Sequence, residues 1–481
     1  MYFKYMNDNQ FNGFFESILP DPRSEKRAEK IMVDLLNFGS VVVNKFCKTH
    51  TEKIGAYRML GNNNYDHDDL AKGVYRSCKA NVHNVHLLGI QDTTELNFTY
   101  HMGRIGKEDA DIGPVTNNDN AGFFCHPMLV IDPSHQLPVG FSSINVWNRS
   151  WDKLSRHERD YHNQDIKEKE SYRWIRSALE TKELLAEDIC ITIIGDRESD
   201  IYDEFAEIPD GRTHLLIRSS INRKLFGEKQ NLFEKLSSST QKATYEIDIH
   251  SNPKRTKRKA KMSLKYEKVK INHPINRPKG NKPDYVEMWA IEARELPESV
   301  PAKEDPVLWR LLTTHSINCV EDALQYIEWY SQRWLIEELF RIIKSKGLCI
   351  ESAQLEAGEG LKKLCILALQ VALTIMTLKL SLHNTHKIKA SLIFSEEHIR
   401  FLEVYMEELE GKTDKLKNPY EEGTVQWASW AIARLGGWSG YISQGPPGYI
   451  TLKDGLVRFY DKSDSFQMAL RYLSKKDVYK D

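Results

Sequence analysis

The sequence has few features that would cross-link the chain. Its seven cysteines are scattered over 481 residues without a Cys-x-x-Cys pair, and its sixteen histidines show no paired spacing with cysteine. We therefore expect neither a disulfide framework nor a structural zinc site, and reduced thiols in a cytoplasm account for the cysteines. The N-terminus also lacks the basic stretch and apolar run of a signal peptide. No internal repeat or low-complexity segment occurs.

Long apolar runs are missing as well. The most apolar segment, residues 364–378, contains Gln370, Thr374 and Thr377. It is shorter than the roughly 20 residues that a membrane-spanning helix needs. We predict a buried helix here and no membrane partner.

Length and composition indicate a folded protein of several domains, because 481 residues exceed one ordinary core. Hydrophobic residues make up 41% and charged residues 28%, as in folded chains. The pattern along the chain predicts a polar, helical segment over 1–75, an α/β core over 76–370 and a helical tail over 371–481. Within the core, residues 212–315 read as a β-rich insertion.

The first predicted helix begins at Asp21-Pro22, with Asp as N-cap and Pro at the first helical position. Four basic residues then share one face of that helix, at Arg23, Lys26, Arg27 and Lys30. A basic face suits phosphate contacts, although a solvated face is the commoner explanation.

Two aspartates follow buried strands. Short apolar runs predict strands over 85–92, 123–132 and 189–196, and a charged helical stretch from 151 to about 187 separates the last two. Asp92 and Asp196 each stand at the C-terminal end of a strand, where α/β sheets usually bind ligands. One such Asp is more often a turn-former, but two on separate strands indicate a shared metal site.

A third carboxylate belongs to the predicted helix WYSQRWLIEELFRIIKSKG, residues 329–347. At about 100° per residue, one polar face of this helix carries Tyr330, Arg333, Glu337 and Lys344. Taken alone, this pattern is typical of an ordinary amphipathic helix. Combined with Asp92 and Asp196, Glu337 completes a set that can hold two Mg²⁺ ions for phosphoryl transfer, with Arg333 and Lys344 beside the phosphates.

Positive charge is concentrated in one stretch of a chain whose net charge is −1. Between Arg218 and Lys282 there are 18 Lys and Arg against 5 Asp and Glu, a local net charge of +13. Such a zone indicates a polyanion site. A solvated, lysine-rich loop is an equally good interpretation of the basic run over 254–261.

The sequence resembles the DDE-class bacterial transposases of the insertion-sequence-four family. The spacing Tyr330-(2)-Arg333-(3)-Glu337-(6)-Lys344 is the signature of that family. Further blocks occur in the family's order: DPR at 21–23, GAYR at 55–58, QDTTEL at 91–96, DRESDI at 196–201, RWLIEE at 333–338 and QWASWAIARLGGW at 426–438. The resemblance covers nearly the whole chain.

The resemblance implies a cut-and-paste transposase with a ribonuclease-H-like catalytic core. A helical N-terminal domain would recognise the transposon end, a β-rich insertion would precede the Glu, and a helical C-terminal domain would dimerise the protein in a synaptic complex. The reaction would proceed by nicking, hairpin formation, hairpin opening and joining to target DNA. The partners would be double-stranded DNA and a second copy of the chain, in the bacterial cytoplasm and nucleoid.

Site residues follow from the same resemblance. Asp92, Asp196 and Glu337 match the ligands of two Mg²⁺ ions, which Mn²⁺ would replace. Tyr330, Arg333 and Lys344 match the group that holds the 5′ phosphate region, and Trp309 matches an aromatic that stacks on a flipped base. The remaining candidates for DNA contacts are Arg218, Trp334, Arg23, Arg27, Arg58, Arg255, Lys257, Arg258 and Lys259.

Three other functions compete with transposition. A ribonuclease-H-like nuclease or resolvase would use the same metals without joining the 3′ ends. A catalytically silent, transposase-derived repressor would bind DNA only, which the intact carboxylates argue against. A glycosidase with paired carboxylates explains neither the +13 segment nor the cations beside Glu337.

Overall fold

In the computed structural model, the chain passes repeatedly between two units instead of completing one before the next. The structure describes residues 10–106, 108–116, 120–151, 164–249, 251, 255–275 and 280–478. The first unit comprises Met1–His83, Thr93–Lys153 and Ile336–Asp481, and the second comprises Asn84–Asp92 and Leu154–Leu335. Each unit therefore combines segments that are far apart in the sequence.

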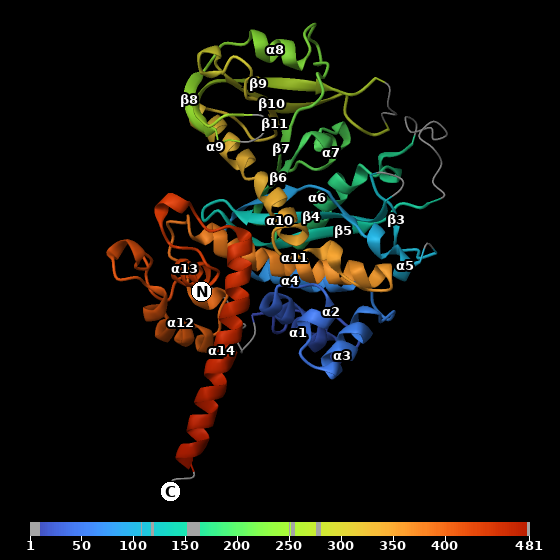
Figure 1. Cartoon of the computed structure of the whole chain (residues 1–481). Helices are drawn as coiled ribbons and strands as arrows, with labels where there is room; N and C mark the ends of the chain where they lie inside the picture. Colours follow the sequence, from blue (N-terminus) through green and yellow to red (C-terminus); the bar gives the residue numbers. More distant parts are fainter. Residues whose placement is uncertain are drawn as a thin grey trace. The chain divides into compact units, whose positions relative to one another are not determined.

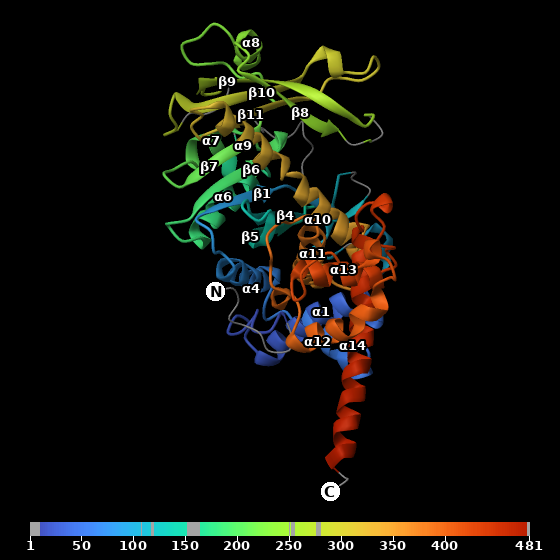
Figure 2. The same ribbon diagram turned by 90° about the vertical axis from the view of Figure 1, so that its left-hand side faces the viewer.

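The second unit contains a mixed sheet in the strand order β1-β6-β7-β11-β10-β9-β8 (Figure 2). The first three strands are parallel and the others antiparallel. Their bounds are β1 His86–Gln91, β6 Cys190–Gly195, β7 Thr213–Arg218, β8 Ala243–Ile249, β9 Arg258–Asn272, β10 Tyr285–Glu295 and β11 Leu308–Thr313. The predicted strands over 85–92 and 189–196 and the β-rich character of 212–315 are confirmed.

Short helices accompany this sheet. They are η2 Ile166–Glu168, α6 Tyr172–Leu184, η3 Arg197–Ser199, α7 Tyr202–Glu207, α8 Leu232–Ser238, η4 Pro297–Ser299 and α9 Val320–Ser331. Helix α8 packs on β9 and β10 (Figure 2). The predicted helical stretch from 151 to 187 is confirmed only as η2 and α6, and its residues 152–163 lie outside the described part of the chain.

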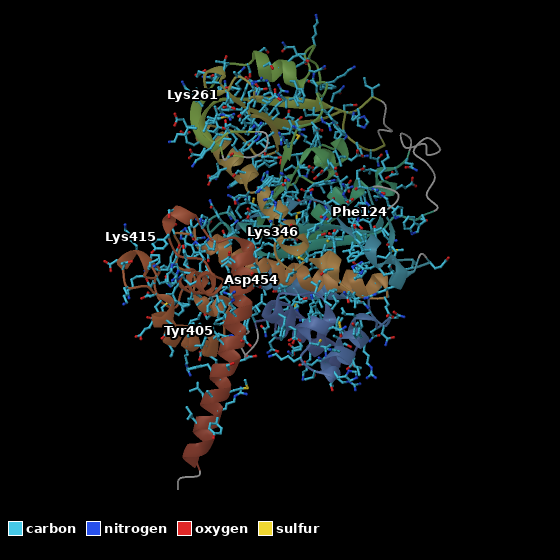
Figure 3. The ribbon with its side chains drawn as sticks, viewed as in Figure 1. Phe124, Lys261, Lys346, Tyr405, Lys415 and Asp454 are labelled. Carbon is cyan, nitrogen blue, oxygen red and sulfur yellow. The ribbon has the colours of Figure 1, made fainter. Side chains whose placement is uncertain are left out.

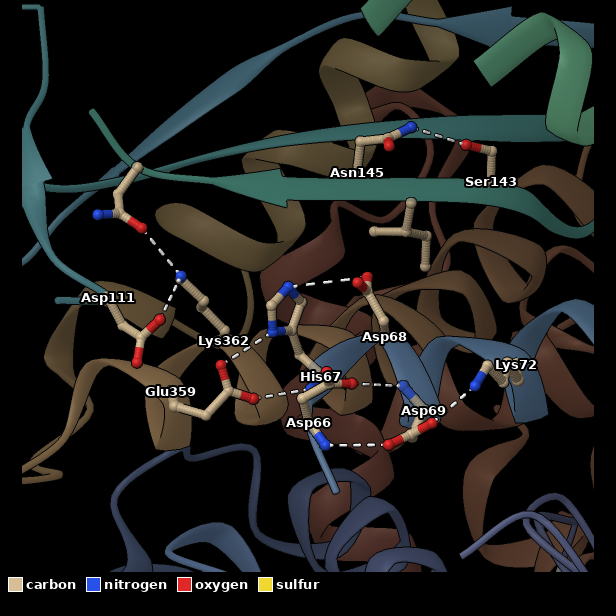
Figure 4. A network of polar contacts seen from close by, with 12 residues as sticks. Asp66, His67, Asp68, Asp69, Lys72, Asp111, Ser143, Asn145, Glu359 and Lys362 are labelled. Atoms are coloured by element: carbon tan, nitrogen blue, oxygen red, sulfur yellow. Dashed lines mark hydrogen bonds and ion pairs between the residues drawn. The ribbon is translucent and has the colours of Figure 1, made fainter. Parts of the chain in front are cut away.

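The strands of the first unit pair antiparallel around β4 (Ala121–Asp132), every residue of which is buried. It pairs with β2 (Thr94–Asn97), β3 (Gly113–Pro114) and β5 (Leu137–Trp147). The predicted strand 123–132 is confirmed, whereas β5 was not predicted. Its polar residues Ser143 and Asn145 are buried and hydrogen-bond to each other at 3.0 Å (Figure 4), so the strand lacks a clear apolar pattern.

Helices make up the rest of the first unit. From the N-terminus they are α1 Pro22–Phe38, α2 Val43–Phe46, α3 His50–Leu60, α4 His67–Ala80, η1 Thr99–His101 and α5 Met102–Ile105. Towards the C-terminus they are η5 Ile350–Ser352, α11 Gly358–Ser381, η6 Ala390–Leu392, α12 Glu396–Leu409, η7 Asp414–Leu416, α13 Val425–Leu435, η8 Ile442–Gln444 and α14 Tyr449–Val478. Helix α10 (Trp334–Lys344) begins in the second unit and continues into the first.

Helix α11 is the central helix of this unit and packs, with α4, against β5 (Figure 1). By length and composition it could cross a membrane, with a mean hydropathy of 1.9 over its most apolar window, but 89% of that window is buried in the protein. It is the one such helix among the described residues. The predicted buried helix over 364–378 is confirmed.

A polar network joins the start of α4 to the start of α11 (Figure 4). The carboxylate of Glu359 accepts a hydrogen bond from the His67 backbone N–H at 2.7 Å and lies 2.9 Å from His67 Nδ1. One turn later, Lys362 Nζ donates to Asp111 at 2.9 Å and to Asn148 at 3.0 Å. Local capping adds to this, because the Asp66 side chain accepts from the Asp69 N–H. These contacts join four segments that are distant in sequence.

Candidate active site

The two predicted aspartates follow adjacent strands of the sheet. Strands β1 and β6 are parallel, with Ile90 opposite Ile194. Extending this register by two residues places Asp92 opposite Asp196, on neighbouring strands about 4.8 Å apart. In parallel strands, residues in register project to the same face. Asp92 and Asp196 therefore follow adjacent strands at the C-terminal edge of the sheet, and we call them the carboxylate pair.

Arg333 contacts the first member of the pair. Its Nη1 donates a hydrogen bond to Asp92 Oδ2 at 3.1 Å. The two side chains are 14% and 20% exposed, so their ion pair is partly shielded from water. A guanidinium held beside the pair can also bind an incoming phosphate, for which its planar geometry is suited.

The segment after β6 explains how Asp196 is oriented. Its Oδ1 accepts a hydrogen bond from the Glu198 backbone N–H at 2.8 Å, capping η3. The turn begins at Gly195, where a Cβ would lie only 2.4 Å from the Ser199 Cβ, so only glycine fits without a shift. Asp200 then anchors the segment through a buried ion pair with Arg223 at 2.7 Å.

Tyr330 lies near Asp196, Arg218 and Arg333 in the same unit, and Trp309 contacts its ring. Burial raises the pKa of Tyr330. The positive charges of Arg333 and Arg218 lower this pKa and the negative charge of Asp196 raises it, so these four groups are neighbours. The Trp309 ring meets the Tyr330 ring edge-on, with centroids 6.0 Å apart. Trp309 is half-buried, which leaves part of its ring accessible.

A cavity of about 270 Å³ opens beside this group. One wall carries Arg310, which donates to Glu292 at 2.7 Å and lies over the Phe233 ring at 4.1 Å. The complete lining is Arg197, Arg218, Ser219, Ser220, Phe233, Leu308 and Arg310. Three arginines around one hollow make it suited to an anion.

Arg173 was not predicted, although it lies close to both aspartates. It projects from α6, donates to the Glu198 carboxylate at 2.6 Å and is 15% exposed. Burial lowers the pKa of Arg173, and the carboxylates of Glu198, Asp196 and Asp92 counteract that shift. Its position in the sequence, within a charged helix, carries no distinguishing signal.

The prediction of one continuous helix over 329–347 is wrong. Helix α9 ends at Ser331 and α10 begins at Trp334, with a turn at residues 332–333. Tyr330, Arg333, Glu337 and Lys344 therefore do not share one helical face, because a wheel of 100° per residue does not hold across a turn. Tyr330 is buried, and Arg333 lies in the turn.

Glu337 and Lys344 project from α10 within the first unit. The apolar side of this helix is buried as predicted, at Ile336, Leu339, Phe340, Ile342 and Ile343. Glu337 is half-buried. Lys344 Nζ donates to the Glu95 carbonyl at 2.8 Å and lies 3.5 Å from the Glu351 carboxylate. Lys344 is thereby held in a defined position beside β2 and η5.

The carboxylate pair fits a divalent cation with hard oxygen ligands. Mg²⁺ is often bound through one or two carboxylates, with water and substrate phosphate in its other positions. Within the described residues, no three His, Cys, Asp or Glu side chains are grouped closely enough to hold an ion by themselves. The pair therefore suits an ion that shares its ligands with a bound phosphate.

Residues 156–375 match the family model for the transposase DDE domain. The match supports a DDE-type transposase. The matched stretch contains Asp196 and Glu337, and Asp92 lies upstream of it. Transposases bind DNA, and DDE transposases generally use divalent metal ions, in agreement with a site of paired carboxylates flanked by arginines.

The basic residues at the start of β9 and just before it differ in their exposure to solvent, which contact with DNA would require. Lys257 and Lys259 are exposed and Arg255 is half-exposed, while Lys254 lies outside the described residues. Arg258 instead donates to both Glu295 and Glu304, at 2.8 and 2.6 Å, and these contacts raise its pKa. Arg258 is thus committed to ion pairs within the protein.

Carboxylates of neighbouring strands also compensate part of the +13 charge. Lys268 lies 2.9 Å and Lys270 3.6 Å from the Glu287 carboxylate on β10. Lys261, on β9 and labelled in Figure 3, lies 3.4 Å from the Glu298 carboxylate. Much of the basic zone is therefore a strand surface with ion pairs, and the second half of the run over 254–261 belongs to β9.

The basic N-terminal candidates occupy α1 and α3. Helix α1 begins at Pro22 with the Asp21 side chain as N-cap, as predicted. Arg23 is 93% exposed and Arg58, on α3, is exposed. The Arg27 guanidinium lies against Gly55, where a Cβ would meet it at 2.7 Å. Arg27 therefore contributes to α1–α3 packing.

Proposed function

We propose that this protein is a cut-and-paste DNA transposase of the insertion-sequence-four family. It would bind transposon ends, cleave them through a hairpin intermediate and join the 3′ ends to target DNA. The observation that carries the proposal is the placement of Asp92 opposite Asp196, with Arg333 donating to Asp92. The match to the transposase DDE domain supports it.

In this proposal Asp92, Asp196 and Glu337 hold two Mg²⁺ ions, which Mn²⁺ can replace. Such ions, when bound, lower the pKa of water and stabilise the attacking and leaving oxygens of an in-line displacement. Tyr330, Arg333 and Lys344 would hold the 5′ phosphate region beside the cut.

Trp309 would stack on a base rotated out of the duplex beside the cut. Its half-buried ring is fixed against Tyr330, so it offers a rigid flat surface at little entropic cost. Arg218, which lines the adjacent cavity, would contact the backbone of the displaced nucleotide. Trp334 is 47% exposed at the start of α10, and we assign it to the same distorted DNA end.

The DNA backbone would extend from this site over the exposed cations of the protein. Arg255, Lys257 and Lys259 would contact it from the β-rich insertion, and Arg23 and Arg58 from the helical N-terminal domain. Arg258 and Arg27 would act indirectly, since both are packed within the protein.

The architecture proposed for this function is a ribonuclease-H-like core over 76–370, with helical domains over 1–75 and 371–481. Parallel strands that end in aspartates support such a core. The C-terminal domain would form the homodimer of the synaptic complex. Exposed apolar side chains along α14 support this role, at Met468, Leu470, Tyr472 and Leu473.

The test uses DNA that carries the short inverted repeats flanking the coding region. Purified protein with Mg²⁺ should nick these ends, form hairpins and join the 3′ ends to a plasmid. Asp92→Ala should abolish cleavage but leave end binding intact, because phosphate contacts supply most of the affinity. Asp188→Ala, at the other end of β6 and exposed, is the matched control and should cleave normally.

Two results would contradict the proposal. Cleavage of the ends without joining would indicate a nuclease or resolvase. Specific end binding by the wild-type protein without cleavage, in both Mg²⁺ and Mn²⁺, would indicate a DNA-binding repressor.

A further inference from the structure

A fully buried acid lies close to the carboxylate pair. Glu204, on α7, has no exposed surface. Its Oε2 accepts a hydrogen bond from Ser199 Oγ at 2.7 Å, and its Oε1 accepts one from Gln91 Nε2 at 3.3 Å. Both partners are also fully buried. Water cannot replace hydrogen bonds in such a place, so they constrain the chain more than surface contacts do.

The two partners belong to the segments that carry the pair. Gln91 is the last residue of β1 and directly precedes Asp92. Ser199 is the last residue of η3, whose N-cap is Asp196. Ser199 also packs on the backbone before Asp196, since a Cβ on Gly195 would lie 2.4 Å from Ser199 Oγ. One carboxyl group thus connects both segments.

The electrostatic state of Glu204 suits a connecting role. Burial raises the pKa of Glu204 to about 8, with a smaller contribution from Asp200, so the carboxyl is neutral at pH 7. The charges around it are compensated, because Asp200 pairs with Arg223 and Asp203 pairs with Lys282. A leucine would fill this space without desolvating a polar group. The hydrogen bonds to Gln91 and Ser199 explain why an acid is there.

We propose that Glu204 is a positioning residue for the carboxylate pair, which sets the spacing of Asp92 and Asp196 through Gln91 and Ser199. This inference rests on the proposed function only in taking the pair as metal ligands. Removing the residues that hold metal ligands in place typically lowers metal affinity 10- to 100-fold.

The experiment measures Mn²⁺ affinity of the full-length, metal-free protein by electron paramagnetic resonance with MnCl₂. Glu204→Leu should weaken Mn²⁺ binding roughly 10- to 100-fold. Glu204→Gln keeps an acceptor and a donor and should bind Mn²⁺ like the wild type. Glu207→Leu and Glu207→Gln, exposed on the same helix, are the matched controls. DNA-end binding in EDTA should be equal for all variants.

Two outcomes would overturn the positioning role. One is a folded Glu204→Leu protein with wild-type Mn²⁺ affinity. The other is an equal loss of Mn²⁺ affinity in Glu204→Gln and Glu204→Leu. If Glu204→Leu shows no cooperative unfolding transition, Ser199→Ala replaces it. That variant removes one hydrogen bond and little volume, and unchanged Mn²⁺ affinity there would also refute the role.

Failure of the two proposals can be told apart. If Asp92→Ala binds Mn²⁺ as well as the wild type does, the pair is not the metal site and both proposals fall. If the pair binds Mn²⁺ and the Glu204 variants behave as expected, but the wild type does not process transposon ends, only the transposase proposal falls.

Discussion

Arg333 Nη1 donates to Asp92 Oδ2 at 3.1 Å, across 241 positions of sequence. This contact connects the turn between α9 and α10 with the end of β1. It lies within the unit that also holds Asp196, Tyr330 and Trp309. The geometry of the cation beside the carboxylate pair therefore depends on both the guanidinium and the turn that presents it.

Replacing Arg333 should impair cleavage more than binding. In Arg333→Lys the charge remains but the planar, two-pronged donor is lost. A hydrogen bond to a charged group contributes about 1.5–3 kcal/mol, so end cleavage should fall roughly 10- to 100-fold. Rates on labelled ends measure the effect, with Arg400→Lys, 73% exposed on α12, as control. An unchanged cleavage rate would contradict a role for Arg333 at the cut.

Trp309→Ala should separate nicking from hairpin formation. The first nick should proceed, whereas hairpin formation should slow by about ten- to a hundredfold, because base–aromatic stacking contributes roughly 1–3 kcal/mol. Trp309→Phe keeps an aromatic ring and should slow hairpin formation less than Trp309→Ala does. An abasic nucleotide at the flipped position should partly rescue Trp309→Ala, since nothing remains to be unstacked. Equal loss of both steps with a lowered melting temperature would instead make Trp309 a purely structural residue.

Lys257→Ala with Lys259→Ala should weaken binding to any duplex and flatten its salt dependence. Each lost phosphate contact reduces the slope of log K against log salt by about 0.9. Arg258→Ala serves as contrast, because its guanidinium pairs with Glu295 and Glu304 and its loss should lower the melting temperature. An unchanged slope in the double lysine variant would show that these side chains are merely solvated.

Histidines cluster at the edge of the sheet opposite to the carboxylate pair. The rings of His214 and His315 are stacked with centroids 3.8 Å apart. Thr192 Oγ1 lies 2.7 Å from His315 Nε2 and 2.9 Å from His86 Nε2. Burial, with smaller contributions from His214 and His86, lowers the pKa of His315 to about 3.

This cluster should make folding sensitive to acid. Between pH 6.5 and 3 the unfolded chain binds a proton at His315 that the folded protein excludes, so stability falls as the pH falls. The free energy of unfolding that His315 contributes should fall by about 2 kcal/mol between pH 6.5 and 5. His315→Phe keeps a stacked ring and should flatten the fall in melting temperature, whereas exposed His383→Phe should not. Parallel melting curves for wild type and His315→Phe would contradict the assignment.

Local sequence determined much of what the structure contains. Apolar runs of strand length predicted β1 and β6, and Asp92 and Asp196 could be placed at their ends, because burial on both faces needs continuous apolar residues. The start of α1 at Pro22 and the burial of α11 were also predicted, since capping and hydrophobicity act over a few residues. All of these depend on neighbours in the chain.

Tertiary structure decided what depends on distant neighbours. The register of β1 against β6 brings Asp92 to Asp196, and β10 supplies the carboxylate of Glu295 that removes Arg258 from the DNA-facing set. The turn at 332–333 divides a helix that periodicity alone makes continuous, and there Arg333 meets an acid 241 residues away. Burial of Glu204 and His315, and hence their shifted pKa values, likewise arises only once strands from several parts of the chain exclude water from them.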